Sequence, residues 1–107
     1  MKNSEINLTI NLDDNHVPEK ISWNATDAEA GNHESSAMLL ALWDSKTKQG
    51  MSIDLWTKEM TIPEMNIFFY QTLLTMSDSF QRATQNKELS EEMKKFARNF
   101  FEKVKQQ

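Results

Sequence analysis

Cysteine is absent from this chain of 107 residues, and glycine and proline occur only twice each. Without cysteine the protein cannot form disulfides, thiolate metal sites or a nucleophilic thiol. Two glycines are also too few for the glycine-rich loops that hold phosphate groups through backbone N–H groups. We therefore expect neither thiol chemistry nor nucleotide binding.

An excess of basic charge is missing as well. Residues 1–60 carry ten acidic residues and five lysines, and residues 61–107 carry six acidic and seven basic residues. Binding to nucleic acid or to an anionic membrane surface requires clustered Lys and Arg, so we expect neither partner. No long apolar run and no leader-like segment is present. The sequence therefore predicts a cytoplasmic protein that does not insert into membranes.

The composition that is present, 38% hydrophobic and 26% charged residues, is typical of a globular protein, and the length predicts one domain over residues 1–107. Apolar and polar residues alternate over residues 4–12, which predicts a strand with one buried face. The polar residues Asp13 to His16 predict a turn. A second strand follows at residues 18–24, so these segments form a predicted hairpin.

Residues 25–35 are small, polar or acidic and are predicted to form a surface loop. The apolar run A-M-L-L-A-L-W predicts a third strand at residues 36–44, and a fourth is expected at residues 51–57 after a polar turn. Alternation places Met38, Leu40 and Leu42 on one face of the third strand.

Two helices complete the predicted fold, at residues 61–84 and 87–106. Thr61 and Glu64 have the spacing of a capping box, and Pro63 suits the first turn of a helix. Asn86 or Ser90 is expected to cap the second helix. The prediction is an α+β fold of order β-β-β-β-α-α, with one four-stranded antiparallel sheet and two C-terminal helices packed on one of its faces.

The chain resembles the GldC family of small gliding motility-associated proteins from Bacteroidetes-type bacteria. The resemblance rests on D-L-W-T-K-E-M, on F-F-Y-Q-T-L-L-T-M-S-D-S-F-Q-R-A-T, on the opening S-E-I-N-L-T-I-N-L-D-D-N-H-V-P-E-K-I-S-W-N-A-T-D and on A-M-L-L-A-L-W-D. It implies a small protein that supports gliding motility and offers no catalytic residues to transfer. The element order is also similar to that of SecB-type export chaperones, although fold analogy alone is a weak guide to function.

Candidate chemical sites are few. His16 and His33 are the only histidines, and a zinc site would need three or four ligands, so two exposed loop histidines are the expectation. Acidic residues such as Asp27, Glu34 and Asp54 are not tied into one cleft by any motif. We predict no catalytic residues, no metal site, no cofactor and no enzyme activity.

Apolar surface is the main functional signal. Two helices cover one face of a sheet, and alternation puts Trp56 on the side opposite Ile53 and Leu55. We predict that Met38, Leu40, Leu42 and Trp56 together form a contact surface on the uncovered face, or that an exposed strand edge makes the contact. The expected partners are a second copy, giving a homo-oligomer, or proteins of the gliding and secretion machinery. Three alternatives stay open: a lid formed by residues 25–35, a SecB-like chaperone for unfolded clients, and a small-ligand or metal site at His16 and His33.

Overall fold

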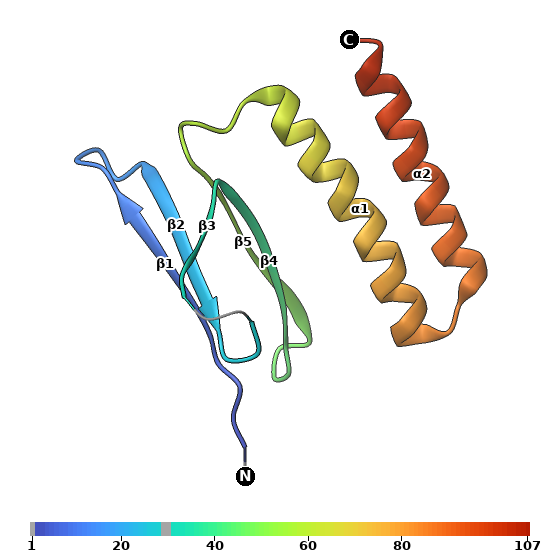
Figure 1. Cartoon of the computed structure of the whole chain (residues 1–107). Helices are drawn as coiled ribbons and strands as arrows, with labels where there is room; N and C mark the ends of the chain where they lie inside the picture. The colour runs from blue at the N-terminus through green and yellow to red at the C-terminus, as the bar shows by residue number, and fades with distance from the viewer. Residues whose placement is uncertain (1, 29–30) are drawn as a thin grey trace. The chain divides into compact units, whose positions relative to one another are not determined.

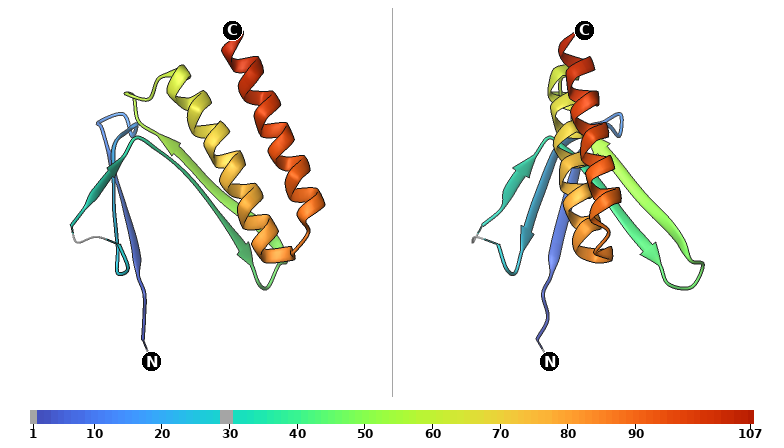
Figure 2. Two further views of the ribbon diagram at one scale, coloured as in Figure 1. Left: turned by 45° about the vertical axis from the view of Figure 1, so that its right-hand side comes forward. Right: turned by 90° about the vertical axis from the view of Figure 1, so that its right-hand side faces the viewer.

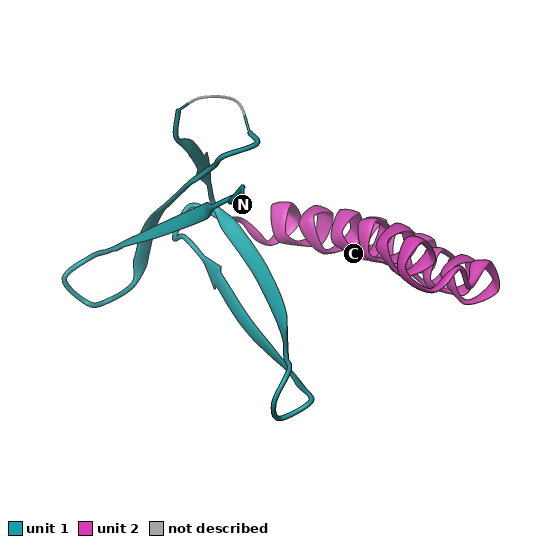
Figure 3. Ribbon diagram, turned by 90° about the horizontal axis from the view of Figure 1, so that it is seen from below, with its two compact units in different colours: residues 1–60 teal, residues 61–107 magenta. Residues whose placement is uncertain are grey.

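The computed structural model describes residues 2–28 and 31–107, and the described chain divides into two compact units. Residues 1–60 form the first unit, which holds the strands, and residues 61–107 form the second, which holds two helices (Figure 3). The predicted α+β class with two C-terminal helices is confirmed.

The first sheet is antiparallel and has the strand order β1–β2–β3 (Figure 1). Its strands are β1 (Ile6–Leu12), β2 (Pro18–Ala25) and β3 (His33–Ser35). Leu8 lies opposite Trp23, and Ile10 lies opposite Ile21, which is completely buried. Because opposite residues of antiparallel strands share a face, the apolar residues gather on one side of this sheet, as their alternation predicts.

The carboxylate of Asp13 supports the β1–β2 connection in addition to backbone hydrogen bonds. Asp13 Oδ1 accepts hydrogen bonds from the backbone N–H groups of Asn15 (2.8 Å) and Val17 (3.0 Å). His16 takes the left-handed conformation, with φ 64°. The predicted hairpin and its polar turn are therefore confirmed.

The second sheet is an antiparallel hairpin of β4 (Ala37–Asp44) and β5 (Gln49–Trp56). Asp44 Oδ1 accepts from the N–H groups of Lys46 and Thr47, each at 2.9 Å, and this closes the turn. The turn length sets the register, in which Leu40 lies opposite Ile53.

The prediction of one four-stranded sheet is wrong, because the structure has five strands in sheets of three and two. The strand β3 lies in the segment that the sequence predicts as a loop, and it continues through Ser36 into β4. The chain bends between β3 and β4, and the two sheets diverge from that corner (Figure 2). A strand of three residues is too short to show a periodicity, which is why the pattern misses it. Residues 29 and 30 of the predicted loop lie outside the described residues.

The second unit is a pair of helices, α1 (Ile62–Thr84) and α2 (Lys87–Lys105). The capping box of α1 is confirmed, since Thr61 Oγ1 accepts from the N–H of Glu64 and the carboxylate of Glu64 accepts from the N–H of Thr61. Asn86, rather than Ser90, caps α2 by accepting from the N–H of Leu89 at 3.1 Å.

The two helices pack closely where their side chains are small. Ser77 of α1 and Ser90 and Ala97 of α2 are buried completely. The Ser90 hydroxyl donates to the Ser77 carbonyl oxygen at 2.8 Å, and the rings of Tyr70 and Phe101 stack with their centroids 4.4 Å apart. An ion pair from Lys94 to Asp78 crosses between the helices at 3.1 Å.

Candidate functional site

The β4–β5 hairpin carries apolar side chains on both of its faces. Met38 lies opposite Leu55, Leu40 opposite Ile53, and Leu42 opposite Met51. Because opposite residues share a face, these side chains form one continuous apolar surface. We call it the Met38 face, and it consists of Met38, Leu40, Leu42, Met51, Ile53 and Leu55.

Trp56 lies on the other side of the hairpin, because its opposite residue is Ala37. The alternate residues of β4 follow Ala37 on that side, while Ser52 and Asp54 add polar groups to it. We call this side the Trp56 face, and its apolar members are Ala37, Leu39, Ala41, Trp43 and Trp56. The prediction that Trp56 shares a face with Met38, Leu40 and Leu42 is therefore wrong.

Each face has strongly exposed apolar side chains, although Met38 and Leu40 themselves are half-buried. On the Met38 face, Leu42 and Met51 are each 60% exposed. On the Trp56 face, Trp43 is 66% and Trp56 is 52% exposed. A single exposed leucine needs no explanation, but contiguous exposed apolar side chains mark interaction sites.

The first sheet offers a clear contrast. The face opposite its apolar side carries only polar and charged residues, from Asn7 and Thr9 of β1 to Glu34 of β3. A side-chain amide of Asn7 donates to Asn24 at 3.1 Å, and Asn24 donates to Asn32 at 2.9 Å. The first sheet therefore has one polar, solvent-facing side, as is usual for antiparallel sheets. The second sheet has no such polar side.

A short ion pair connects the two sheets beside the Trp56 face. Lys58, two residues after β5, pairs with Asp13 in the β1–β2 turn. The hydrogen bond from Lys58 is the main cause that lowers the pKa of Asp13, and the N–H groups of Val17 and Asn15 lower it further. The same hydrogen bond raises the pKa of Lys58. A hollow lined by Val17, Pro18 and the β5 residues Asp54 to Trp56 lies in this region.

Comparison with known proteins identifies the family. The family model for gliding motility-associated proteins of the GldC-like type matches residues 18–106. This chain belongs to the GldC-like family. No curated protein and no solved structure matches it.

The GldC-like match begins at the first residue of β2 and ends one residue after α2. It therefore includes both faces of the β4–β5 hairpin and the whole helical unit, and it confirms the predicted family. Membership associates this chain with gliding motility.

The two histidines of this GldC-like chain occupy different parts of the first sheet. His16 lies in the β1–β2 turn, and His33 lies opposite Trp23, with their ring centroids 4.6 Å apart. His33 Nε2 is buried and has no hydrogen-bond partner among the described residues. Across residues 2–28 and 31–107, no three His, Asp or Glu side chains are grouped as metal ligands require.

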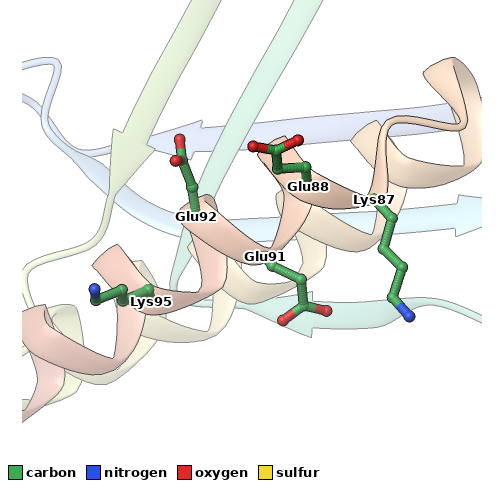
Figure 4. Close-up of a pocket in the computed structure, with 5 residues that line it drawn as sticks. All are labelled: Lys87, Glu88, Glu91, Glu92 and Lys95. Atoms are coloured by element: carbon green, nitrogen blue, oxygen red, sulfur yellow. The ribbon is translucent and has the colours of Figure 1, made fainter.

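Charged residues line a hollow on the first turns of α2, namely Lys87, Glu88, Glu91, Glu92 and Lys95 (Figure 4). All of them come from one helix, and Glu88 and Glu92 point to one side while Lys87 and Glu91 point to another. Lys87 and Glu91 are four residues apart, the spacing of pairs that support exposed helices. This arrangement is a solvated helix face and brings no group together for chemistry.

Neither helix in the described part of the GldC-like chain is long and apolar enough to cross a membrane.

Leu39 and Trp43 are the surface residues that sequence reasoning missed. Both are exposed and lie on the same side of the hairpin as Trp56, with Trp43 at the opposite end. The turn from Asp44 to Gln49 is the sequence signal that could have placed Leu39 and Trp43 on the same face as Trp56. The length of a hairpin loop fixes which residues lie opposite each other.

Proposed function

We propose that this GldC-like protein is a non-enzymatic accessory protein of gliding motility that acts by binding another protein through its β4–β5 hairpin. The observation that carries the proposal is the pairing of exposed apolar residues on both faces of one two-stranded sheet. An isolated hairpin is only marginally stable in water, and it gains stability when a face is covered. Each square ångström of apolar surface removed from water contributes about 25 cal/mol.

The contact residues of the proposal are Met38, Leu40 and Leu42 on one face and Trp56 on the other. Trp43 lies on the same face as Trp56 at the opposite end of the hairpin, and tryptophan is among the residues that most often dominate binding energy at protein interfaces. The proposed partner is a protein of the gliding or secretion machinery. The proposal places this contact in the cytoplasm, in keeping with a chain that has no cysteine.

The test uses two substitutions on β5, one for each face. Ile53→Asp puts a charge on the Met38 face at a position that is 52% exposed, and Trp56→Ala removes the largest side chain of β5 from the Trp56 face. Each variant replaces the native protein in gliding cells, and cell movement and co-purified proteins are measured. At least one variant is expected to lose movement together with a specific co-purified protein.

The matched control is Thr9→Asp, which adds a charge to the polar face of the first sheet. It should leave movement unchanged. Circular dichroism and thermal unfolding must show that the two β5 variants still fold. If folded Ile53→Asp and Trp56→Ala proteins both support normal movement and retain every co-purified protein, the hairpin is not the functional surface.

A second candidate function is that of an export chaperone that holds unfolded clients. The apolar surface on two faces of the hairpin favours it, because methionine side chains such as Met38 and Met51 adapt to varied apolar segments. A chaperone of this kind should suppress aggregation of an unfolded client at equal molar ratio, and Ile53→Asp should weaken the suppression. No effect of the native protein at that ratio would remove this candidate.

A further inference from the structure

We propose that a second copy of this chain pairs with the free edge of β4, antiparallel, to make a four-stranded sheet of order β5–β4–β4–β5. This goes beyond the proposed function, because a strand edge and the faces of the sheet are different surfaces. A gliding partner can occupy a face while the second copy occupies the edge.

The free edge of β4 has backbone groups at known positions. Among the described residues β4 pairs only with β5. The Thr57 N–H donates to the Ser36 carbonyl oxygen at 2.8 Å, so Ser36 turns its backbone groups toward β5. Backbone groups of antiparallel strands alternate in direction along the chain. Ala37, Leu39, Ala41 and Trp43 therefore turn their N–H and C=O groups outward, away from β5.

This edge lacks the features that protect other strand edges. Proteins shield edges with charges, prolines, bulges or very short strands. From Ala37 to Trp43 the β4 edge has no charged residue, no proline and no glycine. By contrast, β3 has three residues, one of them Glu34, and β5 contains Asp54 and Gly50. The pairing of β1 with β2 has an irregularity between Asn11 and Leu12.

The sequence of β4 is complementary to itself in one register. Two antiparallel copies related by a two-fold axis at Leu40 place Ala37 opposite Trp43 and Leu39 opposite Ala41. All four outward-facing residues then have a partner that also faces outward, and a small side chain meets a large one in each pair. If the register between the two β4 strands shifts by two residues toward the β4–β5 turn, Ala37 has no partner within β4 of the second copy. No carboxylate of β4 lies opposite another carboxylate in the Leu40-centred register.

The register makes a sharp prediction for cross-linking, because the chain has no cysteine of its own. Leu40 lies opposite Leu40 of the second copy, at the close Cβ separation of about 4.5–5.5 Å that is typical of such pairs. Disulfides form at Cβ separations of about 3.5–4.5 Å, so a small movement suffices. Leu40→Cys should therefore give a covalent dimer under mild oxidation.

Leu42→Cys is the matched control, since it introduces the same thiol on the same face and strand. Leu42 lies opposite Met38 of the second copy, so the two introduced thiols are separated along the strand by about four residues, or roughly 13 Å. We expect at least about tenfold more covalent dimer with Leu40→Cys than with Leu42→Cys on non-reducing gels. Equal cross-linking of the two variants, or a native protein that remains monomeric in light scattering at high concentration, would overturn the proposal.

A charge exchange tests the register without a covalent bond. Ala41→Lys places a cation opposite Leu39 of the second copy and should weaken association by about tenfold or more. Adding Leu39→Glu to the same chain places opposite charges at both symmetric positions and should restore association. Failure of the double variant to associate better than Ala41→Lys, with both shown to be folded, would contradict the Leu40-centred pairing.

These results separate the pairing from the proposed function. Cross-linking is measured on the purified full chain, whereas movement is measured with Ile53→Asp and Trp56→Ala, which lie on β5 and leave the β4 edge unchanged. Selective Leu40→Cys cross-linking with normal movement of both β5 variants supports the pairing and refutes the hairpin face. Loss of movement without selective cross-linking supports the hairpin face and refutes the pairing.

Discussion

At the scale of single residues, Asp13 connects the β1–β2 turn with the segment that follows β5. Its carboxylate holds the β1–β2 turn through two backbone N–H groups and also binds Lys58, which follows β5. The folded state lowers the pKa of Asp13 below its ordinary value of 3.8, mainly through Lys58. A lowered pKa contributes stability at neutral pH that is lost as the pH falls through the folded pKa. Lys58 has a raised pKa, so its contribution is lost in strongly alkaline solution above 10.5.

Asp13→Asn should destabilise the protein at neutral pH, because it removes the charge that pairs with Lys58 while keeping an oxygen that can accept from the turn. The urea midpoint of Asp13→Asn should lie below that of the native protein at pH 7. The difference should shrink as the pH falls below 3.8 and then through the lower pKa that Asp13 has in the folded protein, where its carboxylate becomes protonated. Asp14→Asn removes the same charge one residue later and serves as the control. A gap in midpoint that is constant from pH 2 to pH 7 would contradict the ion-pair account.

At the scale of elements, the helix pair depends on small side chains. Ser77, Ser90 and Ala97 are completely buried, and the Ser90 hydroxyl reaches across to the Ser77 carbonyl oxygen. Apolar periodicity alone does not reveal this contact, because it highlights large residues such as Phe96, which is 61% exposed. The capping residues Thr61 and Glu64 were predictable, since a capping box depends on local spacing only.

Two substitutions at Ser90 separate hydrogen bonding from packing. Ser90→Ala removes one hydroxyl and should lower the free energy of unfolding by about 1 kcal/mol. Ser90→Leu forces extra volume into a filled position and should lower it by a further ~1–3 kcal/mol. Ser79→Leu makes the same change at an exposed position of α1 and should alter stability by about 0.5 kcal/mol or less. Urea unfolding followed by circular dichroism measures all three, and equal effects of Ser90→Leu and Ser79→Leu would refute the close contact.

At the scale of the whole molecule, few of the large apolar side chains in the described residues are buried. Among the described residues, Ile21 and Ala97 are the buried hydrophobic side chains, while Leu42, Trp43 and Met51 are each at least 60% exposed. Hydrophobic patterning correctly predicted the helices, both hairpins and the apolar face of the first sheet. It could not predict the bend at Ser36, or the register that separates Trp56 from Leu40, because both depend on contacts between strands.

Self-association through β4 should make thermal stability depend on protein concentration. When folding is coupled to association, dilution lowers the unfolding temperature. A tenfold dilution should lower it by a few degrees for the native protein, given the size of the chain. Ala41→Pro removes an outward N–H and leaves the β4–β5 ladder in place, since proline is tolerated at strand edges. Its unfolding temperature should not change with concentration, and differential scanning calorimetry at several concentrations measures both proteins.

The open edge of β4 also has a consequence for how the cell makes this protein. The segment A-M-L-L-A-L-W has seven residues without charge, glycine or proline, which are features of sequences that stack into amyloid-like fibrils. A newly made copy presents this segment to solvent until it meets a second copy. Pairing through β4 therefore also protects the segment from fibril-like stacking.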